Sequence, residues 1–360
     1  MSTALELIHT TDSLAAAAQR SRELEVAVHE DPGAFRILTG DRPTGPLHVG
    51  HYFGTLEYRV RLQDAGVDVV VLIADYQTIT DRDSPAGLAD DVLGLVADYL
   101  AAGIDPERST VFAHSQVPEL NQLLLPFLSL VSTAEVGRNP TVKEEIAATG
   151  GRTTSALMFV YPVHQAADIL FCHANLVPVG KDQLPHLELT RTIARRFDER
   201  YSAGRPYFAP PEALLSRAPL LLGLDGRKMG KSLGNAIPLA AGEDETARLI
   251  RGAKTDGERR IAFDPVRRPE VANLLRLAAL CDGRREEEIA DEIGDRGAAA
   301  LKELVADAVN ERLRPMRVRR RELEGARDYL REVLRAGNEQ ARAVATTTLE
   351  EVRALMATTY

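Results

Sequence analysis

Short apolar runs alternate with longer amphipathic segments along the first two thirds of the chain. The apolar runs are continuous and of strand length, which is typical of strands buried on both faces of a sheet. Strands and helices that alternate through short joints form a parallel sheet with right-handed crossovers. The pattern therefore predicts an α/β fold with a Rossmann-like, doubly wound parallel sheet. Its strands are expected at FRILTG (35–40), VDVVVLIAD (67–75), STVFAHS (109–115) and LVPVG (176–180).

The rest of the chain follows other patterns. From about residue 240 onward there is no strand pattern, and segments rich in Ala, Leu, Glu and Arg predict helices to the end. Residues 1–33 are expected to form an appended arm with a helix at 13–28, which the sequence DPG would end. The expected domains are an N-terminal extension (1–34), a sheet domain (35–235) with a helical insertion at about 119–150, and an α-helical C-terminal domain (236–360).

Composition limits the class of protein. Charged residues make up 27% of the 360 positions and hydrophobic ones 44%, which is typical of globular proteins with a large core. The net charge of −9 argues against a protein that coats nucleic acid without selection. No apolar run approaches the roughly 20 residues that span a bilayer, and the N-terminus lacks the pattern of a signal peptide. We therefore expect a cytoplasmic protein with no membrane partner.

Two further features concern metals and nucleic acids. The two cysteines, Cys172 and Cys281, offer no disulfide framework and no zinc motif, so we expect a reducing compartment and no metal site. RLRPMRVRRR (312–321) is a strongly basic run on a predicted helix. It fits a nucleic-acid contact or a solvated helix face, and the sequence leaves both open.

Polar clusters follow each of the four predicted strands. Because ligands bind beyond the carboxyl ends of the strands in doubly wound sheets, these clusters are expected to meet in one site. No G-x-G-x-x-G follows the first strand, which disfavours dinucleotide binding of the NAD type. The clusters are GDRPTGPLHVGH, ADYQTIT, HSQVPE and GKDQ.

His48 and His51 stand three residues apart at the start of the helix predicted after the first strand. They share one face of its first turn, where backbone N–H groups and the positive end of the helix favour anions. Gly50 between them lets a flat base or sugar approach the backbone. This arrangement favours phosphate binding. Metal ligation would need a third ligand that the sequence does not reveal, and incidental polar residues at a helix start remain an alternative.

The segment GRKMGKSLGN (226–235) carries two of only six lysines, Lys228 and Lys231, among glycines. A Walker A loop is excluded because Asp225 stands where its first glycine is required. Gly234 and Pro238 also oppose the helix that should follow such a loop. The segment is then either a solvated surface turn or a flexible loop that brings two ammonium groups to a ligand.

The motifs together resemble those of class I aminoacyl-tRNA synthetases. PLHVGH (46–51) resembles their HIGH signature, and KMGKS (228–232) resembles their KMSKS loop. YPVHQAADIL (161–170) and LVPVGKDQLPHLELTR (176–191) resemble the amino-acid pocket of the tryptophanyl-tRNA synthetase family. The resemblance is dense over about 35–235 and looser to the C-terminus, and it leaves residues 1–33 outside. It implies a HUP-type Rossmann-like catalytic domain followed by a helical domain that binds the tRNA anticodon.

The resemblance implies a catalytic set of Lys228, Lys231, His48 and His51. Three residues at positions implied to bind ATP depart from the family pattern. Gly230 replaces a serine, Arg42 replaces a glutamine, and Lys181 replaces an acidic residue. The residues implied to bind ATP are Arg42, Pro43, Thr44, Gly50, His51, Gly180, Lys181, Asp182, Lys228, Met229, Gly230, Lys231 and Ser232.

Asp168 is a carboxylate within the apolar stretch AADIL. Such a group needs a partner, and a helix cap or an internal ion pair would supply one. The resemblance implies instead that Asp168 accepts the indole N–H of tryptophan, with Gln165 one helical turn away. It also implies that Tyr161 and Gln183 hold the substrate ammonium, and Gln77 is expected to face the same pocket.

The resemblance implies a tryptophan–tRNA ligase. Such an enzyme activates L-tryptophan with ATP to tryptophanyl-adenylate, with Mg²⁺ carried by the ATP phosphates. It then transfers tryptophan to tRNA(Trp) and releases AMP and pyrophosphate, and the family forms homodimers. The alternatives are a tyrosyl-tRNA synthetase, a related nucleotidyltransferase that acts without tRNA, and a non-catalytic synthetase paralogue that binds tryptophan or tRNA.

Overall fold

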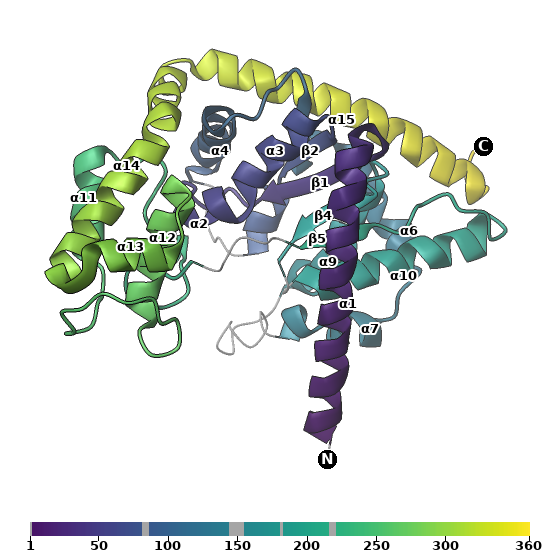
Figure 1. The fold of residues 1–360 in the computed structure, drawn as a ribbon. Helices are drawn as coiled ribbons and strands as arrows, with labels where there is room; N and C mark the ends of the chain where they lie inside the picture. The colour runs from purple at the N-terminus through teal and green to yellow at the C-terminus, as the bar shows by residue number, and fades with distance from the viewer. Residues whose placement is uncertain (1, 81–85, 144–154, 181–182, 216–220) are drawn as a thin grey trace.

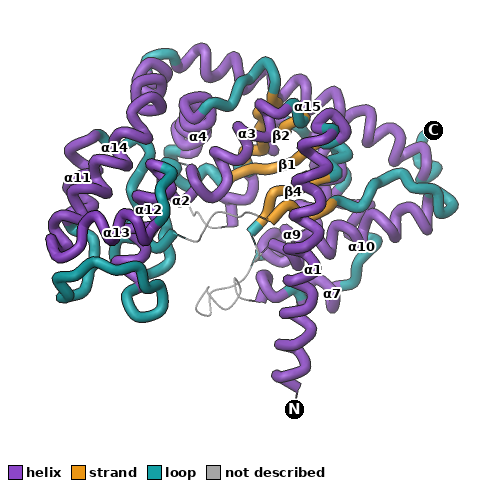
Figure 2. The backbone as a smooth tube through the Cα atoms, viewed as in Figure 1, coloured by secondary structure: helices purple, strands orange, loops and turns teal. Residues whose placement is uncertain are grey.

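The computed structural model describes residues 2–80, 86–143, 155–180, 183–215 and 221–360. Its centre is a parallel sheet in the order β3-β2-β1-β4-β5 (Figures 1 and 2). Four of its strands coincide with the four apolar runs, which confirms the predicted fold class. They are β1 (Arg36–Asp41), β2 (Asp68–Ile73), β3 (Ser109–Ala113) and β4 (Leu176–Val179).

The strand order reverses between β1 and β4. From β1 the chain adds β2 and then β3 on one side, and it then returns to place β4 on the other side of β1. The connections that leave β1 and β4 therefore run in opposite directions along the sheet. This switch point is where a doubly wound sheet opens a crevice for ligands. The fifth strand, β5 (Glu212–Leu215), pairs with β4 and was not predicted, because four residues are too short to give a pattern.

One continuous helical segment of three parts follows β1, as predicted. It consists of α2 (Val49–His51), a π-helical turn (Tyr52–Leu56) and α3 (Glu57–Ala65). The segment ends at Gly66, whose φ of 101° lies in the left-handed region that glycine adopts without strain. A π-helical turn inside a helix is uncommon and is frequent at functional sites. Here it directly follows His51.

The remaining helices of the sheet region lie between and after the strands. The predicted insertion is helical where it is described, whereas residues 144–150 lie outside the described residues. The helices are α4 (Leu88–Ala102), α5 (Pro118–Gln122), α6 (Leu124–Leu128), α7 (Thr133–Arg138), α9 (Ala156–Leu170) and α10 (Leu184–Tyr201).

The C-terminal part is helical, and from 221 onward the described chain forms no strand element. Buried residues of α14, such as Val305 and Val309, belong to the same apolar core as Val96 and Leu100 of α4. The helical part therefore shares its core with the sheet. Its helices are α11 (Glu243–Arg251), α12 (Pro269–Asp282), α13 (Glu286–Ile293), α14 (Gly297–Glu324) and α15 (Arg327–Leu355).

Helix α15 packs against the edge strand β3. Gly337 makes this approach possible, since a Cβ there would lie 2.0 Å from the carbonyl oxygen of Val111. Next to it, Oδ1 of Asn338 accepts the backbone N–H of Ala113 at 3.0 Å. The helix thus gives an edge strand a cover and a hydrogen-bond partner, which protects it from pairing with other chains.

Helix α1 (Ser2–Glu30) extends beyond the predicted 13–28 at both ends. Its C-terminal part packs on the sheet, with Leu24 and Val28 buried. The hydroxyl of Ser21 accepts the N–H of Leu215 at the end of β5 at 2.9 Å. In Figure 1 the first part of α1 projects away from the rest of the molecule. Among the described residues, no helix is both long and apolar enough to cross a bilayer.

Candidate functional site

A cavity of about 1120 Å³ opens at the carboxyl ends of the central strands, at the switch point. Most of the predicted site residues line this cavity. They come from both halves of the sheet and from the loop 226–235, here called the lysine loop. Among the predicted residues, those in its wall are Arg42, His48, Gly50, His51, Gln77, Tyr161, Gln165, Asp168, Gly180, Gln183, Lys228 and Met229. Lys181 and Asp182 lie outside the described residues. Pro43, Thr44, Gly230 and Lys231 belong to the two loops beside the cavity and not to its wall, and the backbone of Ser232 follows Lys231.

The loop that enters α2 is fixed by the segment just after the lysine loop. The N–H of Val49 donates to Ile237 O at 3.0 Å, and the N–H of Leu239 donates to Leu47 O at 2.9 Å. Two stretches nearly two hundred residues apart in the chain therefore share a short backbone ladder. This ladder holds two motifs side by side at the same end of the sheet: PLHVGH (46–51) and KMGKS (228–232).

The imidazoles of His48 and His51 lie against each other, with ring centroids 3.8 Å apart. Nδ1 of His51 accepts the N–H of His48 at 3.3 Å, so a neutral His51 carries its proton on Nε2. Burial, and then the neighbouring positive charge, lowers the pKa of His48 to about 3. Burial outweighs the opposing Asp41 charge and lowers the pKa of His51 to about 4. At neutral pH both rings are uncharged, so they can offer N–H donors to a ligand without adding charge.

A buried ion pair lies beneath these rings, and the sequence analysis missed it. Nη1 of Arg59 donates to Oδ2 of Asp41, the last residue of β1, at 2.6 Å. The hydroxyl of Tyr99 donates to the same oxygen at 2.8 Å. Burial alone would raise the pKa of Asp41, but the charge and hydrogen bond of Arg59 outweigh it and bring the pKa to about 2. The sequence signal was weak, because the two charges stand 18 positions apart.

Asn235 organises the lysine loop, a role that the sequence analysis did not predict. Its Oδ1 accepts the N–H of Gly230 at 3.0 Å. Its Nδ2 donates to Lys228 O at 3.0 Å and to Oδ1 of Asp225 at 2.8 Å. Asn235 is buried, so these bonds to both arms of the loop are protected from water. The loop therefore has a defined shape.

The two motifs touch at two points. Nζ of Lys231 donates to Gly45 O at 2.9 Å, in the loop after β1. Burial lowers the pKa of Lys231, while the carboxylate of Asp41 acts to raise it. Met229 packs over Gly50, since a Cβ on Gly50 would lie 3.0 Å from the sulfur. Glycine at position 50 thus permits the close approach of the lysine loop.

Side chains of α9 and its neighbours form the opposite end of the cavity. Tyr161, Gln165 and Asp168 lie one helical turn apart and line the wall from α9. The hydroxyl of Tyr161 lies 2.9 Å from Nε2 of His186, a lining residue that the sequence analysis missed. Gln183 lies at the start of α10. The described structure therefore brings this predicted set together.

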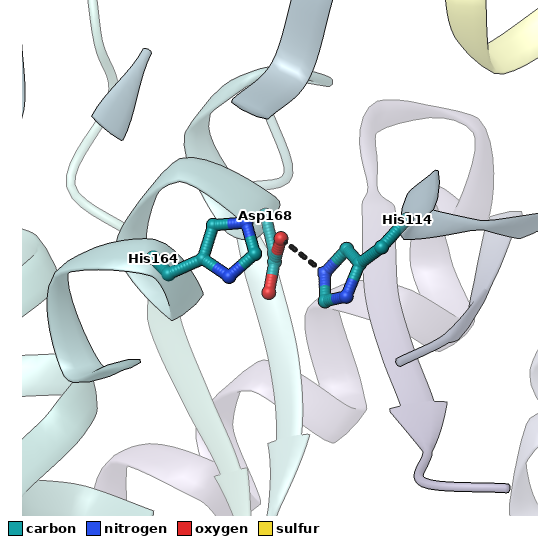
Figure 3. A group of neighbouring side chains, drawn as sticks. All are labelled: His114, His164 and Asp168. Carbon is teal, nitrogen blue, oxygen red and sulfur yellow. Dashed lines mark hydrogen bonds and ion pairs between the residues drawn. The ribbon is translucent and has the colours of Figure 1, made fainter. Parts of the chain in front are cut away.

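Asp168 lies within α9, so the expectation of a helix cap is wrong, and the partner of the carboxylate is an internal imidazole. Oδ1 of Asp168 lies 2.6 Å from Nε2 of His114, which directly follows β3 (Figure 3). Oδ2 has no hydrogen-bond partner among the described residues. A second imidazole, that of His164, lies on the other side of the carboxylate in Figure 3. Burial lowers the pKa of His164. Asp168 can thus be held by one oxygen while the other stays available to a donor.

Comparison with known proteins agrees with these features. Residues 30–316 match the family model described as tRNA synthetases class I (W and Y). A tryptophan–tRNA ligase of Lactococcus lactis is 41% identical over 336 residues, covering 90% of this chain and 98% of the relative. A tryptophan–tRNA ligase of Streptococcus pyogenes is also 41% identical, over 338 residues, with the same coverage.

A solved structure is similar as well. The tryptophanyl-tRNA synthetase of Campylobacter jejuni, complexed with ADP and tryptophan, superimposes with a TM-score of 0.78 at 29% identity. The match covers 90% of this chain and all of that one. Identity of this extent shows common descent over both the sheet and the C-terminal helices. The chain belongs to the class I tRNA synthetases, in their tryptophanyl-tRNA synthetase family.

Proposed function

We propose that this chain is a tryptophan–tRNA ligase that uses one cavity for both substrates of the first step. The observation that carries the proposal is that His48, His51 and Lys228 line one end of the cavity while Tyr161 and Asp168 line the other. ATP with L-tryptophan gives tryptophanyl-adenylate and pyrophosphate. A ribose hydroxyl of tRNA(Trp) then attacks the adenylate carbonyl, and AMP leaves.

The first step needs alignment and charge rather than a base. The attacking carboxylate of tryptophan is already ionised at neutral pH. We assign Lys228 and Lys231 to the phosphoryl oxygens, whose negative charge shifts as pyrophosphate departs. Lys231 now donates to the carbonyl of Gly45, so its ammonium must exchange that partner for a phosphate oxygen when ATP enters.

The neutral imidazoles have a different role from the lysines. His51 offers its Nε2–H as a donor without adding a full charge, because its other nitrogen is occupied by the backbone of His48. Arg42 and Gly50, which line the same end, are assigned to ATP with the segment 43–44 and the loop residues Met229, Gly230 and Ser232. Gly180, at the end of β4, is assigned to ATP as well, together with the neighbouring residues 181–182.

Mg²⁺ is proposed to enter with ATP. Among the described residues, the two carboxylates in the cavity wall, Asp41 and Asp168, are already engaged by Arg59 and His114. A hard cation prefers oxygen ligands and keeps several waters. In this wall the phosphate oxygens are the better ligands, and Mg²⁺ would neutralise part of their charge.

Asp168 is proposed to select indole. Its Oδ2 is buried and can accept the indole N–H, and an unpaired carboxylate would penalise a side chain that lacks such a donor. Gln165 lies one turn away on the same helix face. Tyr161, Gln183 and Gln77 are assigned to the tryptophan ammonium and to the floor of the pocket.

The remaining assignments concern larger partners. We propose that residues 236–360 contact the tRNA anticodon and that the enzyme is a cytoplasmic homodimer. The basic run 312–321 is a poor candidate for the whole tRNA contact, because Arg320 and Arg312 pair with Asp98 and Glu57 of the sheet region. Arg314, Arg319 and Arg321 of that run are exposed and remain candidates.

The test is pyrophosphate exchange into ATP, measured with tryptophan, with tyrosine and without amino acid. The proposal predicts exchange that depends on tryptophan, followed by charging of tRNA(Trp) in a second assay. Exchange with tyrosine instead would assign the chain to the tyrosyl enzymes. No exchange with either amino acid would identify a binding protein and overturn the proposal.

A further inference from the structure

Three buried side chains at the indole end of the cavity form a cluster that the tryptophan mechanism uses only in part. His114, His164 and Asp168 each offer one candidate ligand atom, and these atoms lie within 4.8 Å of one another. The residues are 0%, 3% and 1% exposed. His164 and Asp168 stand four positions apart on α9, a spacing that places two ligands on one helix face. His114 comes from the end of β3.

The protonation pattern of His164 follows from its neighbour. Nδ2 of Asn121 donates to His114 O at 2.9 Å and to Val117 O at 3.0 Å, which fixes Oδ1 of Asn121 as an acceptor. Nε2 of His164 lies 2.7 Å from that oxygen and therefore carries the proton. In the neutral ring Nδ1 is then a lone pair. No described residue donates to it.

His114 faces Asp168 through Nε2, which donates their 2.6 Å bond because a carboxylate only accepts. Oδ2 of Asp168 is a lone pair without a donor among the described residues. Two buried acceptors without donors, Nδ1 of His164 and Oδ2 of Asp168, are costly, which makes the cluster a place for a cation or a donor. A cation bound there would take the place of the Nε2 proton of His114.

The surroundings match those of a metal site. A histidine that binds a metal through one ring nitrogen almost always donates its other N–H to a carboxylate or carbonyl oxygen. His164 does this already, to Oδ1 of Asn121. Two imidazoles and a carboxylate are ligands that suit Zn²⁺ and similar divalent cations, and three protein ligands leave one coordination position open. Asp168 lines the cavity, so that position can open toward it.

We propose that His114, His164 and Asp168 form a binding site for one divalent cation of the zinc class, open to the cavity. The expectation from sequence that the chain holds no metal site rested on the lack of a local motif. The fold joins His114 to Asp168 across 54 positions, which no local motif records.

The proposal has a consequence for the substrate, which rests on the proposed function. Oδ2 of Asp168 cannot accept the indole N–H and bind a cation at the same time. Tryptophan and the cation therefore compete, and zinc inhibits amino-acid activation by raising the KM of tryptophan. ATP binds at the other end of the cavity and does not displace the cation.

The first experiment titrates metal-free enzyme with Zn²⁺ by calorimetry, and with Co²⁺ by visible absorption as a probe of the ligands. We expect one equivalent to bind, with affinity lowered at least about 100-fold in His164→Gln and in His114→Gln, because each loses a ligand. The matched control is His51→Gln, since His48 and His51 are the other paired imidazoles. Circular dichroism melting verifies that each variant is folded.

The results separate the alternatives. Binding that persists in both cluster variants and disappears in His51→Gln would put the cation among the phosphate-binding rings and overturn the proposal. Binding that tryptophan weakens and ATP leaves unchanged supports it, whereas binding insensitive to tryptophan overturns the competition. Tryptophan-dependent pyrophosphate exchange by the metal-free enzyme reports on the proposed function separately.

Discussion

Nε of Arg320 in α14 donates to Oδ1 of Asp98 in α4 at 2.6 Å. The other oxygen of the same carboxylate accepts the backbone N–H of Leu47 at 3.1 Å, one residue before His48. Asp98 is fully buried, and burial raises its pKa against the opposing charge of Arg320. A single carboxylate thus joins the C-terminal helices to the loop that carries His48.

This relationship predicts the effect of Arg320→Met. Removing the guanidinium leaves a buried carboxylate without its charge partner, which we expect to lower the free energy of unfolding by about 3 kcal/mol. Because Asp98 also positions Leu47, ATP should bind more weakly as well. Urea unfolding and the KM for ATP measure the two effects. Arg319→Met, at the exposed neighbouring position, is the control and should change neither; equal stability of the two variants would contradict the assigned role of Asp98.

The two glycines of the motifs are predicted to differ. Gly230 has φ −156°, an extended conformation open to any residue, and a Cβ there would meet Leu233 at an ordinary 3.4 Å. Gly230→Ser, which restores the residue usual in the family, should therefore change stability by less than about 0.5 kcal/mol and the KM for ATP by less than about threefold.

Gly50→Ala is the contrasting variant. Its Cβ would lie 3.0 Å from both the ring of His48 and the sulfur of Met229, so the lysine loop must move away. We expect a loss of about 1–2 kcal/mol in ATP binding, which is roughly a tenfold higher KM for ATP. Steady-state kinetics at saturating tryptophan measure it. Similar KM values for Gly50→Ala and Gly230→Ser would show that the motifs do not touch at Gly50.

The fold was largely predictable because its signals are local. Each central strand is a continuous apolar run, and such runs have few other structures open to them. The features that were not predicted had no local signal. The four residues of β5 form a strand only because β4 offers a partner, and α1 extends past its periodic section. The basic run 312–321 gave no sign that Arg320 is paired inside the molecule.

The residues of the candidate site were also predictable only in part. Its motif residues could be recognised from short segments, and the described structure brings them to one cavity. The residues that hold the motif residues in place could not be recognised, because their contacts join distant segments of the chain. These contacts are Asp41 with Arg59, Asp98 with Leu47 and His114 with Asp168. A buried charged residue in an apolar run was the one available signal, and only Asp168 was recognised by it.

Stability is predicted to depend on pH through His51. The unfolded chain protonates this imidazole near its ordinary pKa of 6.5, whereas the folded chain does so only at about 4. Its contribution is therefore fully present above pH 6.5 and is lost as the pH falls to about 4. Asn at position 51 cannot take up this proton, so the free energy of unfolding of His51→Asn should fall by about 3 kcal/mol less than that of the wild type across this window.

Urea unfolding at several pH values between 7 and 4 provides this measurement. The Asp41–Arg59 pair does not interfere, since its contribution is lost only as the pH falls from about 4 toward 2. Parallel curves for the wild type and His51→Asn would mean that the imidazole is not held neutral by burial.

Amino-acid selection is predicted to depend on Asp168. Asp168→Ala removes the acceptor for the indole N–H and should lower kcat/KM for tryptophan by about 100-fold, the scale of a lost hydrogen bond to a charged group. The KM for ATP should stay within about threefold, because we assign ATP to the part of the cavity lined by His48 and His51. Pyrophosphate exchange at varied tryptophan and at varied ATP separates the two. Tryptophan parameters near those of the wild type would remove Asp168 from the indole site.

The central claim is that the sheet and the backbone ladder unite the histidine and lysine motifs around one triphosphate. Single-turnover formation of tryptophanyl-adenylate tests it most directly in Lys231→Ala, with Lys302→Ala as the control. Both lysines donate to a backbone carbonyl, of Gly45 and Arg251 respectively, but only Lys231 does so beside the cavity. We predict a rate at least about 100-fold lower for Lys231→Ala and an unchanged rate for Lys302→Ala. A rate for Lys231→Ala close to that of the wild type would contradict the account.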